Sequence, residues 1–187
     1  WNESPREMFQ KYTDNKEHLC SGSNLNLFKS FSQLNNLKSD MSKFIMEYAN
    51  YIGSVCEDII INSAWLNNSK KGSTLDYHFH SNSFISANYF INFIPGNHSQ
   101  LTFQNDRVFS GKYPDYPTLV IPSKDTPTIY NAPSIGLEAK EGQIFVWRSH
   151  KVHGYSEPNK EDNRLTLSLN SMPKILDNGK YSFSVIE

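Results

Sequence analysis

The stretch "LDYHFHSNSFISANYF", from Leu75 to Phe90, holds two histidines one residue apart, just ahead of an aromatic, β-prone run. Side chains at positions i and i+2 of a strand lie on the same face, so His78 and His80 would point the same way on a strand or at its end. Imidazole is a good ligand for Fe, Zn, Cu and Ni, which makes the pair a natural start to a metal site. Taken alone, however, the pair is explained better by two polar positions of a surface strand that face water.

Further along the chain, "VWRSHKVHGYSEPN" offers a third imidazole, from His153 or from its neighbour His150. Arg164 then opens "RLTLSLN", a strand in which Arg164, Thr166 and Ser168 share one face. An Arg with neighbouring hydroxyls inside a barrel needs an anionic partner, and a planar guanidinium suits a bidentate carboxylate. The alternative is an Arg at a strand end that pairs with a surface acid.

From Asp58 onward the chain reads as short strands separated by turns, which is typical of a β-sandwich or barrel. The strand-like segments are "DIIINSAWL", "SFISANYFINFIP", "QLTFQ", "SIGLEAK", "QIFVWR", "RLTLSLNSM" and "YSFSVIE". Before them, apolar residues recur at helical spacing and predict a helix over residues 40–55, with Ser39 or Asp40 as its N-cap. We therefore expect one mainly β domain, with a helical support region over 1–57 and a β core over 58–187.

The composition and charge of the chain disfavour binding to nucleic acid or to a membrane. The 187 residues suit one globular domain, and the net charge of −1 gives no bulk attraction to nucleic acid or to an anionic membrane. No apolar run reaches the roughly 20 residues that a membrane span needs, and the N-terminus lacks the apolar core of a signal peptide. Cys20 and Cys56 fit no metal or redox spacing and are expected to be free thiols. These features predict a cytoplasmic protein.

The ordered motifs resemble those of the Fe(II)/2-oxoglutarate-dependent oxygenases. More narrowly, the chain is similar to small, largely uncharacterised members, many of them encoded by marine phages, which carry a Trp strand, H-x-H-x-N-S, an S-G-x-Y-Y-type strand, E-G-D-x-x-x-F-P-S, H-x-V-x-P-N and R-x-S-x-S-x-N. This chain has "NSAWLN", "HFHSNSFISANYF", "KEGQIFVWRS", "HGYSEPN" and "RLTLSLN" in the same order. The resemblance covers residues 59–172.

The resemblance implies a double-stranded β-helix (jelly roll) with the N-terminal helices packed on its outside. It also implies a hydroxylase in which Fe(II) is held by His78, His80 and His153, and in which 2-oxoglutarate is converted to succinate and CO2. A phage-encoded member would work in the host cytoplasm.

The resemblance further implies where the cosubstrate binds. Arg164, helped by Thr166 or Ser168, would bind its distal carboxylate. Tyr89 is a candidate phenol donor to that carboxylate, or else ordinary aromatic core, and Asn170 is expected to line the pocket from the same face as Arg164.

The chain departs from the family pattern in three places. His80 stands where most of the superfamily has Asp or Glu, so three neutral imidazoles would leave Fe(II) with a net charge of about +2 instead of about +1. Ala87-Asn88 replaces a Gly-apolar pair, and "VWRS" replaces F-P-S.

Two other ligand assignments stay open. Asp76 with His78 could form the pair in reversed order, or His80 could be the first histidine with Asn82 in the acid position. His98 is expected to be a solvated turn residue, as is His18 in the N-terminal tail.

Two other functions fit the same residues. One is a three-His, cupin-like dioxygenase that does not use 2-oxoglutarate, and the other is a non-enzymatic jelly-roll binding module. The substrate of an oxygenase could be a protein side chain, a small metabolite or a nucleobase, with long nucleic acid disfavoured by the charge. The Pro-rich stretch 106–133 is a candidate lid, with Tyr113 and Tyr116 as possible substrate contacts, or else a plain surface loop.

Overall fold

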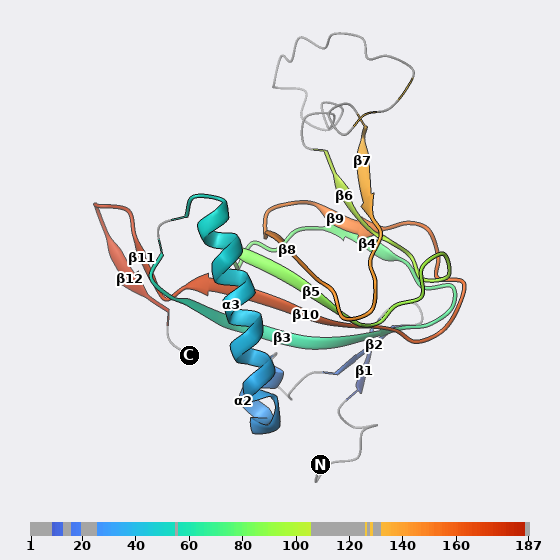
Figure 1. Cartoon of the computed structure of the whole chain (residues 1–187), viewed down its shortest axis with the longest axis horizontal. Helices are drawn as coiled ribbons and strands as arrows, with labels where there is room; N and C mark the ends of the chain where they lie inside the picture. Colours follow the sequence, from blue (N-terminus) through green and yellow to red (C-terminus); the bar gives the residue numbers. More distant parts are fainter. Residues whose placement is uncertain are drawn as a thin grey trace.

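The computed structural model describes residues 9–12, 16–19, 26–54, 56–105, 126, 128 and 132–185. Two antiparallel sheets dominate the described part of the chain (Figure 1). The larger sheet has the strand order β1-β2-β3-β10-β5-β8 and the smaller one the order β4-β9-β6-β7. The strands of the larger sheet are Phe9–Tyr12 (β1), Lys16–Leu19 (β2), Ile59–Ser69 (β3), Ile85–Asn92 (β5), Ile144–Arg148 (β8) and Arg164–Pro173 (β10). Those of the smaller sheet are Leu75–His78 (β4), Leu101–Gln104 (β6), Ser134–Leu137 (β7) and His153–Tyr155 (β9).

Strand β10 is the centre of the larger sheet, because it pairs along its length with β3 on one side and with β5 on the other. A separate hairpin of β11 (Ile175–Asp177) and β12 (Ser182–Ser184) follows β10. The central strands of both sheets have non-consecutive neighbours: β3, β10, β5 and β8 in the larger sheet, and β4, β9 and β6 in the smaller one. This is the crossed-over connectivity of a jelly roll. The expected mainly β, double-stranded β-helix fold is confirmed.

The helices cover the outer face of the larger sheet. They are α2 (Leu27–Ser30), the 3-10 turn η1 (Ser32–Leu34) and α3 (Asn35–Tyr51), and α3 crosses β3, β10 and β5 (Figure 1). Met41, Ile45 and Ala49 lie on the buried stripe of α3. They pack in one apolar cluster with sheet residues that include Leu167 and Leu169. The cluster therefore contains residues of the N-terminal region, 1–57, and of the β core, 58–187.

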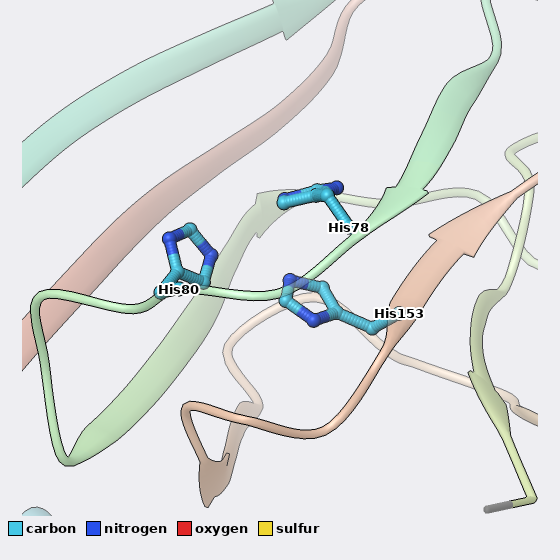
Figure 2. A group of neighbouring side chains, drawn as sticks. All are labelled: His78, His80 and His153. Carbon is cyan, nitrogen blue, oxygen red and sulfur yellow. The ribbon is translucent and has the colours of Figure 1, made fainter. Parts of the chain in front are cut away.

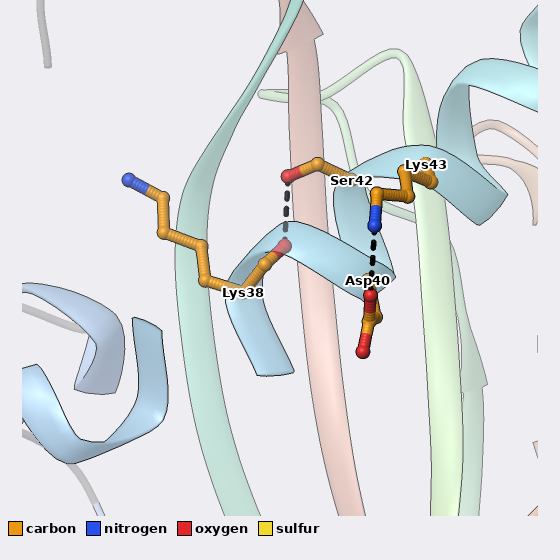
Figure 3. A network of polar contacts seen from close by, with 4 residues as sticks. All are labelled: Lys38, Asp40, Ser42 and Lys43. Atoms are coloured by element: carbon orange, nitrogen blue, oxygen red, sulfur yellow. Dashed lines mark hydrogen bonds and ion pairs between the residues drawn. The ribbon is translucent and has the colours of Figure 1, made fainter. Parts of the chain in front are cut away.

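The long helix begins earlier than the sequence indicated. It starts at Asn35, directly after η1, with Leu34 as an N-cap that makes no side-chain hydrogen bond. The proposed caps Ser39 and Asp40 lie inside the helix, where Asp40 instead accepts a hydrogen bond of 3.1 Å from Lys43. Figure 3 shows this pair beside the bond from Ser42 Oγ to the carbonyl of Lys38. The prediction of a cap was wrong because a continuous turn leads into the helix and no extended residue precedes it.

A second apolar cluster fills the space between the two sheets on the side of β5, β6 and β8. Its buried members are Phe90, Phe93, Leu101, Ala139 and Trp147. Among the described residues, no helix has the length and apolar character needed to cross a membrane. The proposed lid residues Tyr113 and Tyr116 lie outside the described part of the chain.

Candidate functional site

Three histidines meet between the sheets. His78 ends β4, His153 begins β9 as its cross-strand partner, and His80 lies two residues beyond β4 in the loop that leads to β5. One ring nitrogen from each lies within 4.8 Å of those of the other two. Figure 2 shows the three rings gathered around one point, with a nitrogen of His80 turned toward the other two histidines. Three imidazoles this close together could hold a metal ion.

A glycine makes the close approach of β4 and β9 possible. A Cβ added at Gly154 would lie 2.6 Å from the carbonyl oxygen of Leu75, far inside contact distance. The sequence "HGY" therefore lets His153 and Tyr155, on either side of Gly154, enter the pocket from a strand that lies directly against β4.

Backbone carbonyls fix the tautomers of two of the histidines. The Nδ1 atom of His78 lies 2.7 Å from the carbonyl oxygen of Asp76, and that of His153 lies 2.8 Å from the carbonyl oxygen of Lys151. A carbonyl only accepts, so each Nδ1 donates a proton to it and each Nε2 keeps a free lone pair. Both side chains are thus prepared to bind a metal through Nε2.

His80 is held differently, because it lies in a loop. Its backbone N–H donates to the carbonyl of Ser149 at 2.9 Å. Its ring Nδ1 lies 3.4 Å from Nδ2 of Asn170, on β10. The third imidazole is therefore positioned by residues that are distant in the sequence.

Burial favours the neutral form of two of the histidines. Burial, with a smaller contribution from the charge of His78, lowers the pKa of His80 to about 4. It also lowers the pKa of His153 to about 4; the hydrogen bond to Lys151 opposes this shift, while the charges of His78 and His80 add to it. At neutral pH both imidazoles are therefore unprotonated, which is the form that binds a metal.

The alternative ligands do not point into this group. The side chains of Asp76, Asn82 and His150 are exposed, and Asp76 is absent from the cluster of nearby ligand atoms. The expectation that His98 is solvated was wrong, since its side chain is only 3% exposed. Its Nδ1 accepts from the backbone of Ile94 and its Nε2 bonds the carbonyl of Asp162. His98 is therefore a structural residue of the turn.

A small pocket of about 80 Å³ adjoins the histidines. It has room for several water molecules or a compact organic acid. Its lining comes from both sheets and includes Trp65, Asn67, Ser69, Leu75, Ser86, Asn88, Trp147, Tyr155, Arg164, Thr166 and Ser168.

Among the described residues that line this pocket, Arg164 is the only arginine or lysine. It is 2% exposed, and its Nε donates to the carbonyl of Ser99 at 3.1 Å. Its Nη2 is buried without a partner, and within the described ranges no carboxylate forms an ion pair with it. Burial lowers its pKa, and the guanidinium lies 4.7 Å from the ring centroid of Tyr155. A buried cation with a spare donor is unfavourable unless an anion binds beside it.

The rest of the pocket floor is a hydrogen-bonded layer. Ser168 Oγ accepts from Asn67 at 2.6 Å and donates to Asn88 at 2.7 Å. Its hydroxyl is therefore already occupied. Thr166, one step closer to Arg164 on the same face, is 1% exposed. A second buried donor in the pocket lacks a partner, Nε1 of Trp147, whose ring centroid lies 4.9 Å from that of His153.

Tyr89 does not enter the pocket. Ser86 and Asn88 line the cavity, so the alternation of β5 turns Tyr89 to the opposite face, where it packs against the helix-facing cluster. The alternative reading of Tyr89 as aromatic core fits this placement. The tyrosine in the pocket is Tyr155, whose hydroxyl lies 3.2 Å from that of Ser69. The sequence held a signal for it, because Tyr155 follows His153 by two positions on the same strand.

Comparisons with known proteins agree with this geometry. A family model described as "Putative 2OG-Fe(II) oxygenase" matches residues 63–170. That range includes all three histidines and Arg164. A search of curated proteins finds no match.

Several solved structures share the fold. An oxidoreductase of the 2OG-Fe(II) oxygenase family from Burkholderia pseudomallei is 12% identical, with a TM-score of 0.54 over 89% of this chain and 66% of that one. The epimerase SnoN, in complex with Fe3+, alpha ketoglutarate and nogalamycin RO, is 11% identical, with a TM-score of 0.60 over 90% and 69%. HygX from Streptomyces hygroscopicus, with nickel and 2-oxoglutarate bound, is 10% identical, with a TM-score of 0.57 over 88% and 73%. The chain thus spans about two thirds of the length of such structures.

Proposed function

The chain belongs to the 2OG-Fe(II) oxygenase family, and on this premise we propose that it is an Fe(II)- and 2-oxoglutarate-dependent oxygenase, most simply a hydroxylase. One observation carries the proposal. Three imidazoles and a buried guanidinium whose Nη2 has no partner line the same small cavity. The imidazoles are suited to bind a metal ion, and the guanidinium is suited to bind an anion.

His78, His80 and His153 are the proposed metal ligands. The donor set fits Fe(II), since three imidazoles on one side leave three positions of an octahedron for a bidentate 2-oxoacid and O2. Bound iron would couple the oxidative decarboxylation of 2-oxoglutarate to oxidation of the substrate, giving succinate and CO2. Because imidazoles carry no charge, the dianionic cosubstrate would neutralise the metal that the protein leaves at about +2.

Arg164 is the proposed partner of the distal carboxylate of 2-oxoglutarate. Its free Nη2 supplies a charge-assisted donor, and Thr166 lies next to it on the same face of β10. Phe90, Phe93 and Tyr155 surround the guanidinium. These rings exclude water and so strengthen the attraction between the guanidinium and a carboxylate.

Ser168 and Asn170 have other roles in this proposal. Ser168 orders the floor of the pocket through Asn67 and Asn88, and Asn170 contacts His80 instead of the cosubstrate. Tyr155 takes the place that the sequence had suggested for Tyr89, because its ring lies against the guanidinium.

For the substrate we propose a small molecule handled in the cytoplasm, which would be the host cytoplasm if a phage encodes the chain. The fold relatives support a small molecule, since SnoN was solved with nogalamycin RO and HygX with hygromycin B.

The test is an anaerobic titration with Fe(II) and 2-oxoglutarate that follows the weak visible charge-transfer band of the chelate. The wild type should give the band, and should form succinate when air is admitted. Arg164→Met should bind Fe(II) normally but lose the band at ordinary concentrations of 2-oxoglutarate. Arg148→Met is the matched control, because Arg148 is an exposed arginine of the same sheet. A wild type that binds Fe(II) but gives neither band nor succinate would overturn the proposal and favour a three-His dioxygenase that does not use 2-oxoglutarate. Normal behaviour of Arg164→Met would remove Arg164 as the partner of the distal carboxylate.

A further inference from the structure

A chain of side-chain hydrogen bonds runs from His80 to the loop before β5. Asn170 Nδ2 lies 3.4 Å from His80 Nδ1, and Asn170 Oδ1 accepts from Ser86 Oγ at 2.8 Å. Ser86 Oγ lies 2.8 Å from Ser149 Oγ, which accepts from Ser83 Oγ at 2.8 Å. Asn170 and Ser86 are cross-strand partners of β10 and β5. All the links of the chain therefore lie on rigid strands or directly beside them.

The middle members of this hydrogen-bond chain are shielded from solvent. Asn170 is 4% exposed, Ser86 is 2% exposed and Ser149 is 0% exposed, whereas Ser83 is half-buried. A buried polar group must find its partner within the protein. The donor and acceptor roles are therefore linked, so that the direction of one hydrogen bond sets the direction of the others.

In the arrangement observed, the hydrogen bonds run toward His80. Ser83 donates to Ser149, Ser86 donates to Asn170 Oδ1, and the Asn170 amide faces His80 Nδ1 with its donor atom. His80 Nδ1 must then be the acceptor, so the proton of this neutral ring lies on Nε2. This is the opposite tautomer to that of His78 and His153, whose Nδ1 atoms donate to carbonyls.

A metal that joins the three rings requires all three Nε2 lone pairs. His80 must therefore carry its proton on Nδ1, and this N–H then needs an acceptor. Asn170 supplies one if its amide turns over, since the carboxamide oxygen and nitrogen have almost the same shape. Nδ2 then donates to Ser86, Ser86 to Ser149 and Ser149 to Ser83, whose hydroxyl can turn to solvent. Every buried group stays paired in both directions.

We propose that Asn170 and Ser86 are positioning residues for the third metal ligand, and that this hydrogen-bond chain reverses its direction when His80 binds the metal. The inference rests on the proposed metal site. It explains why Asn170 faces the histidines and not Arg164. It also explains how a loop histidine, which lacks the carbonyl contact of the other two, is held for ligation.

Metal affinity tests the role of Asn170. With Ni(II) as the probe in calorimetric titrations of the whole chain, Asn170→Leu should bind about 10- to 100-fold more weakly than the wild type, the usual cost of losing such a partner. Asn170→Asp should bind at least as tightly as the wild type, because a carboxylate accepts from Nδ1–H. Equal affinities for Asn170→Leu and the wild type would overturn the proposal while leaving the metal site intact. A wild type that binds no metal would overturn the proposed function itself.

Ser86→Ala and Ser171→Ala form a matched pair of variants. Each removes one buried hydroxyl from the larger sheet, but Ser171 Oγ bonds the carbonyl of Ile85 and has no link to His80. Ser86→Ala should lower Ni(II) affinity several-fold, whereas Ser171→Ala should not change it. Equal effects of the two variants would mean that the loss is general destabilisation, and would contradict the proposal.

The tautomer itself is observable. In protein labelled with ¹⁵N at histidine, the ring nitrogen shifts of His80 should show Nε2–H without metal and Nδ1–H after saturation with Zn(II), a diamagnetic probe. His78 and His153 should show Nδ1–H in both states. A His80 ring that already has Nδ1–H in the metal-free protein would rule out the reversal.

Discussion

Alternate residues of strand β10 face opposite sides of the sheet: one set packs in the apolar core, and the other lines the cavity. Leu167 and Leu169 pack against the helix-facing cluster and are 2% and 1% exposed. Arg164, Thr166 and Ser168, on the other face, are equally buried but line a polar cavity. Burial alone therefore does not separate core from site. What separates them is chemistry: the cavity face carries polar groups, among them the Nη2 donor of Arg164, which is buried without a partner.

Substitutions on the two faces of β10 should therefore affect different properties of the protein. Changes on the cavity side should remove function and spare stability, and changes on the helix side should do the reverse.

His153→Ala should abolish function with little loss of stability. Losing a direct ligand should weaken metal binding by more than about 100-fold, since even the outer partners of ligands cost 10- to 100-fold. Stability of the metal-free protein should stay near that of the wild type, because a buried neutral imidazole contributes little without its metal. Succinate formation, Ni(II) titration and thermal unfolding measure the three quantities. Unchanged metal affinity would remove His153 from the site.

Leu167→Ala should show the opposite behaviour. The side chain is 2% exposed in the cluster with α3, so its truncation should cost about 2–5 kcal/mol of unfolding free energy. Metal affinity of the folded fraction should not change, because Leu167 points away from the cavity. Urea unfolding and Ni(II) titration at low temperature separate the two. A large loss of affinity in fully folded protein would mean that the faces are coupled.

The same cluster gives a role to the N-terminal helices. We propose that residues 1–57 form a support region for the β core over 58–187, and that they act through contacts such as that of Ile45, which is fully buried. Leu167→Ala tests this indirectly, since it weakens the sheet side of that contact.

The division of β10 into a cavity face and a helix face can largely be predicted from the sequence. Period-2 alternation in "RLTLSLN" places Arg164, Thr166 and Ser168 together, and the order of the motifs indicates the jelly roll. The role of Tyr89 stayed open, and the burial of His98 was missed, for one reason. Which face of a strand is inside, and whether a turn is buried, depend on packing against segments that are distant in the sequence.

The start of the helix and the partner of His80 were missed for related reasons. The helix begins in a turn that carries no capping side chain, so no local signal marks it. Asn170 is 90 positions from His80, and only the pairing of β10 brings it to the ring. Contacts of this kind have no signature in a single sequence.

Stability of the metal-free protein should fall as the pH decreases from about 6.5 toward 4. The pKa of His153 is about 4 in the folded chain against 6.5 when unfolded, so the unfolded state binds more protons in this window. The stabilisation is complete above pH 6.5 and is lost as pH falls through 4. For His153 it amounts to about 3 kcal/mol at most, and it is smaller for the less buried His80.

Chemical unfolding with a chelator at pH 7.5 and pH 5 checks this prediction. His153→Asn should flatten the dependence, since it removes one of the two shifted groups but keeps a polar side chain. Equal free energies at both pH values in the wild type would show that the cavity does not hold its histidines neutral.

Tyr155→Phe and Tyr89→Phe offer the finest test of the two faces. Each removes one phenol hydroxyl, from the cavity side and from the helix side respectively. Tyr155 lies against the guanidinium and bonds Ser69. Its loss should raise the KM for 2-oxoglutarate by about 3- to 10-fold, the value of one hydrogen bond. Tyr89→Phe should leave KM within about 2-fold, because the strand alternation turns it away from Arg164. If Tyr89→Phe raised KM and Tyr155→Phe did not, the placement of β5 relative to the cavity would be wrong.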